Sequence, residues 1–135
     1  MYLRLNFEKR AIYDSRESGI TIEAILRHGA SEVSCDAKVD TGAQVCLFRR
    51  ELGDSLGLDI ESGYRRNFGT LTGGFVAYGH EITLETLGLA FDVMVYFPRE
   101  YDIRRNLLGR QGWLQLVRLG LVDYDCEIYL SRLWD

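Results

Sequence analysis

One carboxylate in the sequence stands where it could do chemistry. Asp40 follows the alternating segment 32–39 directly and opens the triplet Asp40-Thr41-Gly42. Gly42 permits unusual backbone angles and the close approach of another chain, and the Thr41 hydroxyl can bond the backbone and fix the loop. Backbone N–H groups in such a turn can keep a carboxylate ionised. Because roughly a few per cent of chains of this length contain such a triplet by chance, its surroundings decide what it means.

The other reactive side chains are scattered along the chain. The cysteines are odd in number and lack the short spacing of a zinc site or a disulfide framework. The two histidines are also far apart. We therefore expect reduced, buried thiols, surface imidazoles, no metal site, and a reducing, cytoplasmic compartment. The residues concerned are Cys35, Cys46, Cys126, His28 and His80.

A second motif points to a different chemistry. Residues 53–57 read Gly-Asp-Ser-Leu-Gly, which fits both the Gly-x-Ser-x-Gly elbow of serine hydrolases and the Gly-Asp-Ser-Leu signature of a lipase family. An elbow follows a core strand in a large α/β sheet and needs a late histidine. Here the motif falls late in a short helical stretch, and the histidine after it, His80, lies in a predicted hairpin. We therefore expect Ser55 to be a solvated residue at a helix end.

Composition and charge limit the classes of function. The 135 residues are 47% apolar and 27% charged, with a formal net charge of -4, which fits one folded domain with a packed core. There is no basic stripe of the kind that binds nucleic acid. The longest apolar stretch, 87–97, contains Asp92 and is too short to cross a bilayer, and the charged first ten residues do not fit a signal peptide. We expect neither a nucleic-acid nor a membrane partner.

The elements that must position Asp40 are mostly strands. Alternating or β-branched runs, separated by turns such as 28–31, predict strands. A long hairpin with a glycine-rich tip is expected over 68–84, and short helices over 49–58 and 111–119. The predicted strands are 2–7, 20–26, 32–39, 89–97 and 121–130. This pattern favours an all-β domain with one or two short helices and a closed, barrel-like architecture.

Three segments, in this order, give the triplet a context. They are Val39-Asp40-Thr41-Gly42-Ala43, Gly69-Thr70-Leu71-Thr72-Gly73-Gly74-Phe75 and Asn106-Leu107-Leu108-Gly109-Arg110. Together they resemble the active-site loop, the flap tip and the loop-supporting segment of the retropepsin-like (retroviral-type) aspartic proteases, in their cellular and bacterial single-domain branch. The resemblance implies the acid-protease fold with one lobe per chain, over residues 20–135. Residues 1–19 are then an N-terminal extension that adds a strand.

The resemblance also implies a mechanism. Two Asp40 carboxylates share one proton, because like charges a few Å apart cannot both ionise. One acts as general base on a water that attacks a peptide carbonyl, and the other polarises that carbonyl and helps to protonate the leaving amine. No metal or organic cofactor is implied. Asp40 is then catalytic, Thr41 and Gly42 support the loop, and the residues at the peptide or protein substrate are Ala43, Gly73, Gly74 and Leu107.

A homodimer follows from the same resemblance. The chain carries one Asp-Thr-Gly triplet and no internal repeat, so a second carboxylate must come from a second copy across a two-fold axis. In the family, the hydroxyl that corresponds to Thr41 bonds the partner's loop, and the chain ends interleave; segments 126–130 and 2–7 are the candidates here. The sequence departs from viral members at Gln44, where they usually carry an acid that pairs with the arginine matching Arg110. Gln44 can still accept a hydrogen bond.

A different class of function fits the same residues. A domain of this fold could dimerise and bind peptides without cleaving them, because fold does not guarantee function. The glycine-rich segment 69–75 could equally be a plain hairpin turn. The intact Asp40 favours the enzyme, since a binding module has no need of the carboxylate.

Overall fold

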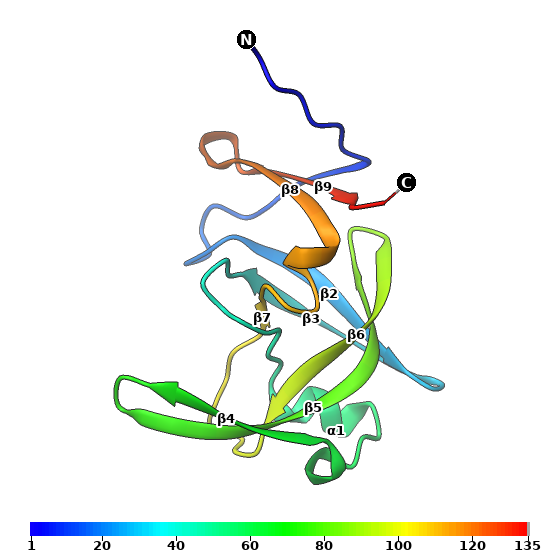
Figure 1. Cartoon of the computed structure of the whole chain (residues 1–135), viewed down its shortest axis with the longest axis vertical. Coiled ribbons are helices and arrows are strands. Elements are labelled where there is room, and N and C mark those ends of the chain that lie inside the picture. Colours follow the sequence, from blue (N-terminus) through cyan, green and yellow to red (C-terminus); the bar gives the residue numbers. More distant parts are fainter. Residues whose placement is uncertain (135) are drawn as a thin grey trace.

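The computed structural model describes residues 1–134, so the last residue of the expected domain lies outside the described residues. Strands dominate and form two sheets (Figure 1). The larger has the order β4-β5-β2-β3-β7, with β6 also paired to β5, and the smaller has the order β1-β9-β8. The strands are β1 Lys9–Ile12, β2 Thr21–His28, β3 Ser31–Val39, β4 Tyr64–Thr70, β5 Gly73–Thr86, β6 Leu89–Pro98, β7 Leu107–Leu108, β8 Val117–Val122 and β9 Glu127–Arg132. The predicted all-β fold class is confirmed. Among the described residues, no helix is long and apolar enough to cross a membrane.

The β2–β3 hairpin carries the chain to Asp40. Side chains of β2 alternate between the core and the surface, with Leu26 fully buried, because successive residues of a strand point to opposite faces. Gly29 forms the turn with φ 58, a backbone angle that glycine adopts without a steric penalty. The strands are antiparallel, with Ala24 opposite Cys35. Both predicted strands and the turn between them are confirmed.

A long hairpin, β4–β5, projects from the body of the molecule (Figure 1, green). Its pairing runs from Tyr64 opposite Gly79 to Thr70 opposite Gly73, which leaves Leu71 and its neighbour as the exposed turn. The remainder of β5 pairs with β2 and β6. The predicted hairpin with a glycine-rich tip is therefore confirmed, and its base is anchored in the larger sheet.

One of the two predicted helices is present. The short helix α1 (Arg50–Ser55) lies within the predicted segment 49–58. The predicted helix 111–119 is wrong: only the 3₁₀ turn η2 (Leu114–Leu116) forms there, and β8 begins at the next residue. Gly112, two residues before this turn, has φ 95, which lies outside the α-helical region. From Val117 on, the backbone N–H and C=O groups are hydrogen-bonded to β9 instead of within a helix.

The C-terminal segment folds as a hairpin. The single strand predicted over 121–130 is wrong in detail, because β8 and β9 are separate strands joined by the 3₁₀ turn η3 (Asp123–Asp125). Cys126 follows that turn in the left-handed region, with φ 55. In the smaller sheet β9 lies between β1 and β8, and both of its edges are paired within the chain. The resemblance suggested that residues 126–130 interleave with a partner's strand, but β9 has no free edge for such pairing.

The N-terminal segment supplies the outer strand of the same sheet. The predicted strand 2–7 is wrong, since residues 1–7 form no strand and β1 begins at Lys9. Phe7 packs against the Tyr129 ring, with centroids 5.7 Å apart. The carboxylate of Glu8 accepts hydrogen bonds from the Arg132 N–H and the Ser131 hydroxyl, both at 2.9 Å, and these bonds lower the Glu8 pKa. These contacts of Phe7 and Glu8 fix where the chain enters the smaller sheet. The alternation of residues 2–7 had placed the strand several residues before Lys9, where it begins.

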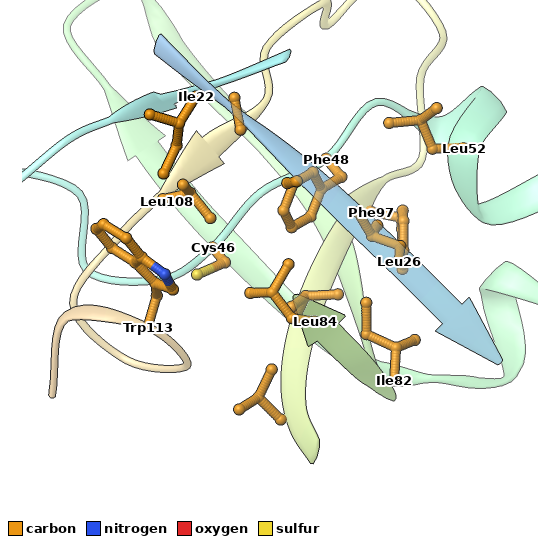
Figure 2. Packing of buried hydrophobic residues seen from close by; sticks show 14 of the residues in the cluster. Ile22, Leu26, Cys46, Phe48, Leu52, Ile82, Leu84, Phe97, Leu108 and Trp113 are labelled. Atoms are coloured by element: carbon orange, nitrogen blue, oxygen red, sulfur yellow. The ribbon is translucent and has the colours of Figure 1, made fainter. Parts of the chain in front are cut away.

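The core lies between the two sheets and α1. Ten of its residues are labelled in Figure 2, drawn from strands, α1, the segment after Asp40 and the turn before η2. Trp113 and Phe48 are among the largest fully buried side chains, and each such burial stabilises the fold by roughly 1.5–3 kcal/mol. The Trp113 indole N–H donates to the Thr86 hydroxyl at 2.9 Å, and Thr86 is itself buried. The one polar group of this side chain is therefore satisfied inside the core.

Candidate active site

Asp40 lies at the end of β3, held by the short strand β7. β3 and β7 are parallel, with Val39 opposite Leu108, and the Asp40 N–H donates to the Leu108 carbonyl at 3.0 Å. One carboxylate oxygen, Oδ1, accepts the Gly42 N–H at 2.9 Å. The backbone of Asp40 is therefore fixed by β7, and its half-buried side chain is held by the turn that follows.

Gly109 packs directly against the loop that follows Asp40. A Cβ at Gly109 would lie 2.1 Å from the Val45 carbonyl oxygen and 2.9 Å from that of Ala43, so no other residue fits there without moving the loop. Two backbone bonds tie the segments together, Arg110 N–H to Ala43 O and Gln111 N–H to Gln44 O, both at 2.9 Å. Segment 106–110 thus supports the loop, as the resemblance implied.

The side chains of Gln44 and Arg110 do not take part in this support. Arg110 is exposed and, within residues 1–134, its guanidinium makes no hydrogen bond or ion pair. The backbone bonds described above link the two segments instead. Beneath the loop, Cys46 is buried, and burial raises its thiol pKa to about 11. A neutral thiol therefore lies under the loop, where the Gly109 N–H meets its sulfur at 3.4 Å.

The two neighbours of Asp40 in the triplet are exposed. The Thr41 hydroxyl makes no hydrogen bond to the described part of its own chain. A Cβ on Gly42 would come within 3.3 Å of the Asp40 carboxylate, tighter than ordinary contact. Gly42 therefore keeps the space beside the carboxylate open, and Thr41 keeps a free donor at the surface.

An apolar hollow of about 260 Å³ opens beside Asp40. The predicted substrate residues Ala43 and Leu107 both line it. Gly73 and Gly74 do not, because they lie farther out at the hairpin tip. The sequence reasoning missed Phe68 and Phe75, which the hairpin contributes instead. The full lining is Asp40, Ala43, Gln44, Val45, Leu47, Phe68, Gly69, Phe75 and Leu107.

Aromatic contacts hold the hairpin over this hollow, close to its tip. Phe68 and Phe75 are opposite one another in the β4–β5 pairing and stack with centroids 5.4 Å apart. Phe68 also meets the Tyr96 ring edge-on at 5.5 Å, and Arg66 lies 5.1 Å from the Phe68 centroid. Such contacts each stabilise by roughly 0.5–1.5 kcal/mol. An aromatic residue on each side of the glycine-rich tip was the signal that could have identified these two.

A larger, polar hollow of about 530 Å³ also has Asp40 and Leu107 in its wall. Its remaining lining is Glu17, Ser18, Thr21, Asp36, Lys38, Arg49, Arg104, Arg105 and Asn106. Asp40 is therefore bordered by two hollows of different chemistry. The sequence analysis predicted none of the cations in the polar one.

The other reactive residues lie elsewhere. Ser55 is exposed at the end of α1, as expected, and Gly53 is required by packing, since a Cβ there would meet the side chains of Ile60 and Phe97. The three cysteines are free, as predicted, but only Cys46 is fully buried, whereas Cys35 and Cys126 are half-buried. His80 is not a surface imidazole: it is half-buried, and its Nε2 lies 2.8 Å from the Ile60 carbonyl oxygen. Within residues 1–134, no group of three or more acidic, histidine or cysteine side chains could hold a metal ion.

Comparison with solved structures identifies the fold. A retropepsin-like aspartic protease from Rickettsia conorii superimposes with a TM-score of 0.70 at 22% identity, over 92% of this chain and 99% of that one. EIAV protease complexed with the inhibitor HBY-793 superimposes with a TM-score of 0.52 at 18% identity, over 80% of this chain and 88% of that one. No family model matches the sequence, and no curated protein does so. The chain has the retropepsin-like fold, and the resemblance in its sequence is confirmed at that level.

Proposed function

We propose that this chain is an aspartic endopeptidase that hydrolyses peptide bonds with a water activated by two Asp40 carboxylates, one from each subunit of a homodimer. The observation that carries the proposal is the presentation of Asp40. A loop clamped by β7 and Gly109 holds its backbone at the border of two hollows, and the β4–β5 hairpin roofs one of them. The fold shared with aspartic proteases agrees with this chemistry.

The chemistry follows from bringing two such carboxylates together. Like charges a few Å apart cannot both ionise, so the pair binds one proton between them. The ionised carboxylate takes a proton from water, which attacks the peptide carbonyl carbon. The protonated carboxylic acid donates to the carbonyl oxygen and later helps to protonate the leaving amine. The Gly42 N–H donates to Oδ1 of Asp40 and holds that carboxylate oxygen in position.

The dimer supplies the second carboxylate. A two-fold axis beside the Asp40 loop makes the contact isologous, with the same loop from each subunit. The exposed Thr41 hydroxyl, which lacks a partner within residues 1–134, can then donate to the other subunit's loop. Because both edges of β9 are paired in the chain, the strands left to meet a partner in the smaller sheet are β1 and β8.

The experiment is a digest of a peptide library by the wild type and by Asp40→Asn. The substitution keeps the shape of the side chain but removes the base, so kcat should fall by orders of magnitude while the protein stays folded. Asp59→Asn is the matched control, since Asp59 is exposed and lies outside both hollows. Cleavage by Asp40→Asn at the wild-type rate would overturn the proposal.

A binding module without catalysis predicts a different result. Peptides would then bind equally well to the wild type and to Asp40→Asn, and neither protein would cleave them. A statine-type inhibitor separates the two functions further, because its hydroxyl occupies the position of the attacking water and binds far more tightly than substrate only where a dyad exists. A silent module would bind it no better than the parent peptide.

A further inference from the structure

The polar hollow beside Asp40 is rich in cations. Lys38, Arg49, Arg104 and Arg105 all line it. Arg104 is already paired, with its guanidinium 2.9 Å from the Glu51 carboxylate. The other three make no side-chain hydrogen bond or ion pair within residues 1–134. Three positive charges therefore lie at the edge of the candidate site without a hydrogen bond or ion pair in the described chain, although Glu51 attracts Arg49 electrostatically.

One of these cations is partly desolvated. The Nε of Arg49 is buried and has no hydrogen-bond partner among the described residues. A buried donor without an acceptor is costly, and a charged one more so. Its backbone N–H donates to the Asn106 side-chain oxygen at 3.0 Å. The Glu51 carboxylate attracts this guanidinium without bonding it, so an acidic group bound in the hollow would supply the acceptor that Nε lacks.

The cations are held on a rigid frame. Lys38 and Asp40 are two positions apart at the end of β3, so their side chains leave the same face of the chain where the strand is regular. Carbon atoms of Lys38 lie within 2.7–3.2 Å of the place where a Gly19 Cβ would stand, so its stem rests on that glycine. Asn106 bonds the Asp36 carbonyl at 3.2 Å as well as Arg49, which fixes the backbone next to Arg105.

Carboxylates in the same wall reduce the surplus but do not remove it. Apart from Asp40, which the reaction uses, the hollow contains Glu17 and Asp36. Three unpaired cations thus face two carboxylates, and the balance is positive. The neighbouring apolar hollow has no lysine or arginine in its lining. The two hollows therefore differ in charge, although both border the same catalytic carboxylate.

Resting on the proposed function, the geometry points to a substrate class: peptides with a glutamate or aspartate beside the scissile bond, next to an apolar residue. The polar hollow takes the acidic side chain and the apolar hollow takes its neighbour. Successive side chains of an extended peptide point to opposite sides, so two hollows that meet at Asp40 receive consecutive residues. Charge in the polar hollow then sets specificity, through Lys38, Arg49 and Arg105.

The test compares matched peptides that carry glutamate or glutamine at each position around the cleaved bond. A charge-assisted contact at a partly exposed site should favour glutamate by about tenfold in kcat/KM at one of these positions. The preference should shrink as salt is raised, because surface charges are screened. Equal rates for glutamate and glutamine at every position would overturn the inference.

Variants assign the preference to the hollow. Arg105→Gln and Lys38→Gln should each reduce the ratio of glutamate to glutamine rates, and Arg105→Glu should reverse it in favour of a lysine peptide. The matched control is Arg65→Gln, which removes the same charge from an exposed position outside both hollows. Because the readout is a ratio, a general loss of activity or of dimer leaves it unchanged. A ratio equally altered by the control would count against this hollow.

Binding to Asp40→Asn separates this inference from the proposed function. If the wild type cleaves no peptide, the proposed function fails, but fluorescence anisotropy can still compare glutamate and glutamine peptides on the variant. Tighter binding of the glutamate peptide, weakened by Arg105→Gln, would support the hollow as an acid-binding site. If cleavage depends on Asp40 but acidic residues give no advantage in rate or in binding, the proposed function stands and this inference falls.

Discussion

Gly109→Ala should displace the loop that follows Asp40 and so distort the candidate site. The new Cβ would stand 2.1 Å from the Val45 carbonyl oxygen, whereas a carbon and a carbonyl oxygen in close contact stay about 3.3 Å apart. The loop after Asp40 must therefore move by about 1 Å. That movement strains two backbone hydrogen bonds, from Arg110 N–H to Ala43 O and from Gln111 N–H to Gln44 O, both at 2.9 Å.

The magnitude follows from these contacts. Overpacking costs about 1–3 kcal/mol, and two weakened backbone bonds add about 1 kcal/mol each, which gives about 3–5 kcal/mol in total. At roughly 4 °C per kcal/mol for a domain of this size, Tm should fall by roughly 12–20 °C. A shift of about 1 Å in a catalytic group also lowers activity by about 100-fold. Hence kcat/KM should fall even at temperatures where the variant is folded.

Thermal and urea denaturation measure the stability, and the peptide assay measures the activity. Gly69→Ala is the matched control for stability, because a Cβ at Gly69 would meet nothing within 4 Å and its Tm should change by no more than about 2 °C. If Gly109→Ala melted as the wild type does, the clamping of the Asp40 loop by this segment would be refuted.

Three further outcomes follow from the structure. Trp113→Phe should lower the free energy of unfolding by about 1–3 kcal/mol, because it leaves the buried Thr86 hydroxyl without the donor at 2.9 Å. Urea titrations of this variant, of Thr86→Val and of the double variant form a double-mutant cycle, and a cycle without coupling between the two sites would contradict this reason. The Tyr13 hydroxyl donates to Asp123, and this bond together with burial raises the Tyr13 pKa to about 12. The stability it contributes is therefore present below about pH 10 and lost as pH rises toward 12, and urea midpoints should lose this alkaline dependence in Tyr13→Phe; an unchanged dependence would exclude the contact as its cause. Specific activity should fall when the enzyme is diluted below its dimer dissociation constant, and excess Asp40→Asn should poison the wild type through mixed dimers; sedimentation that found a fully active monomer would rule out the shared dyad.

Much of the fold could be read from local patterns. β-branched residues identified β2, period-two alternation identified β3, and a glycine-rich tip identified the β4–β5 hairpin. These predictions succeeded because alternation and turn chemistry act within a few residues. Elsewhere strand pairing decided against the local pattern. Residues 117–119 belong to β8 and not to the predicted helix, and residues 2–7 lie outside the sheet, which the chain enters at Lys9.

The sequence by itself determined which group could do the chemistry and what would support it. Asp40 after an alternating strand, the glycine that follows it, and the segment that ends in Gly109 could all be recognised from residue types and order. Such features are local, because a carboxylate in a tight turn and a glycine at a close approach are required wherever the loop occurs.

Only the tertiary structure decided what surrounds Asp40. Phe68 and Phe75 reach the apolar hollow through the β4–β5 pairing, and Lys38 and Arg105, far apart in the chain, border the same polar hollow. The periodicity of the sequence does not predict which distant residues lie together, because that depends on how β3 pairs with β7 and where each strand ends. Charge and shape beside Asp40 are properties of the packed chain, and the proposed substrate preference rests on them.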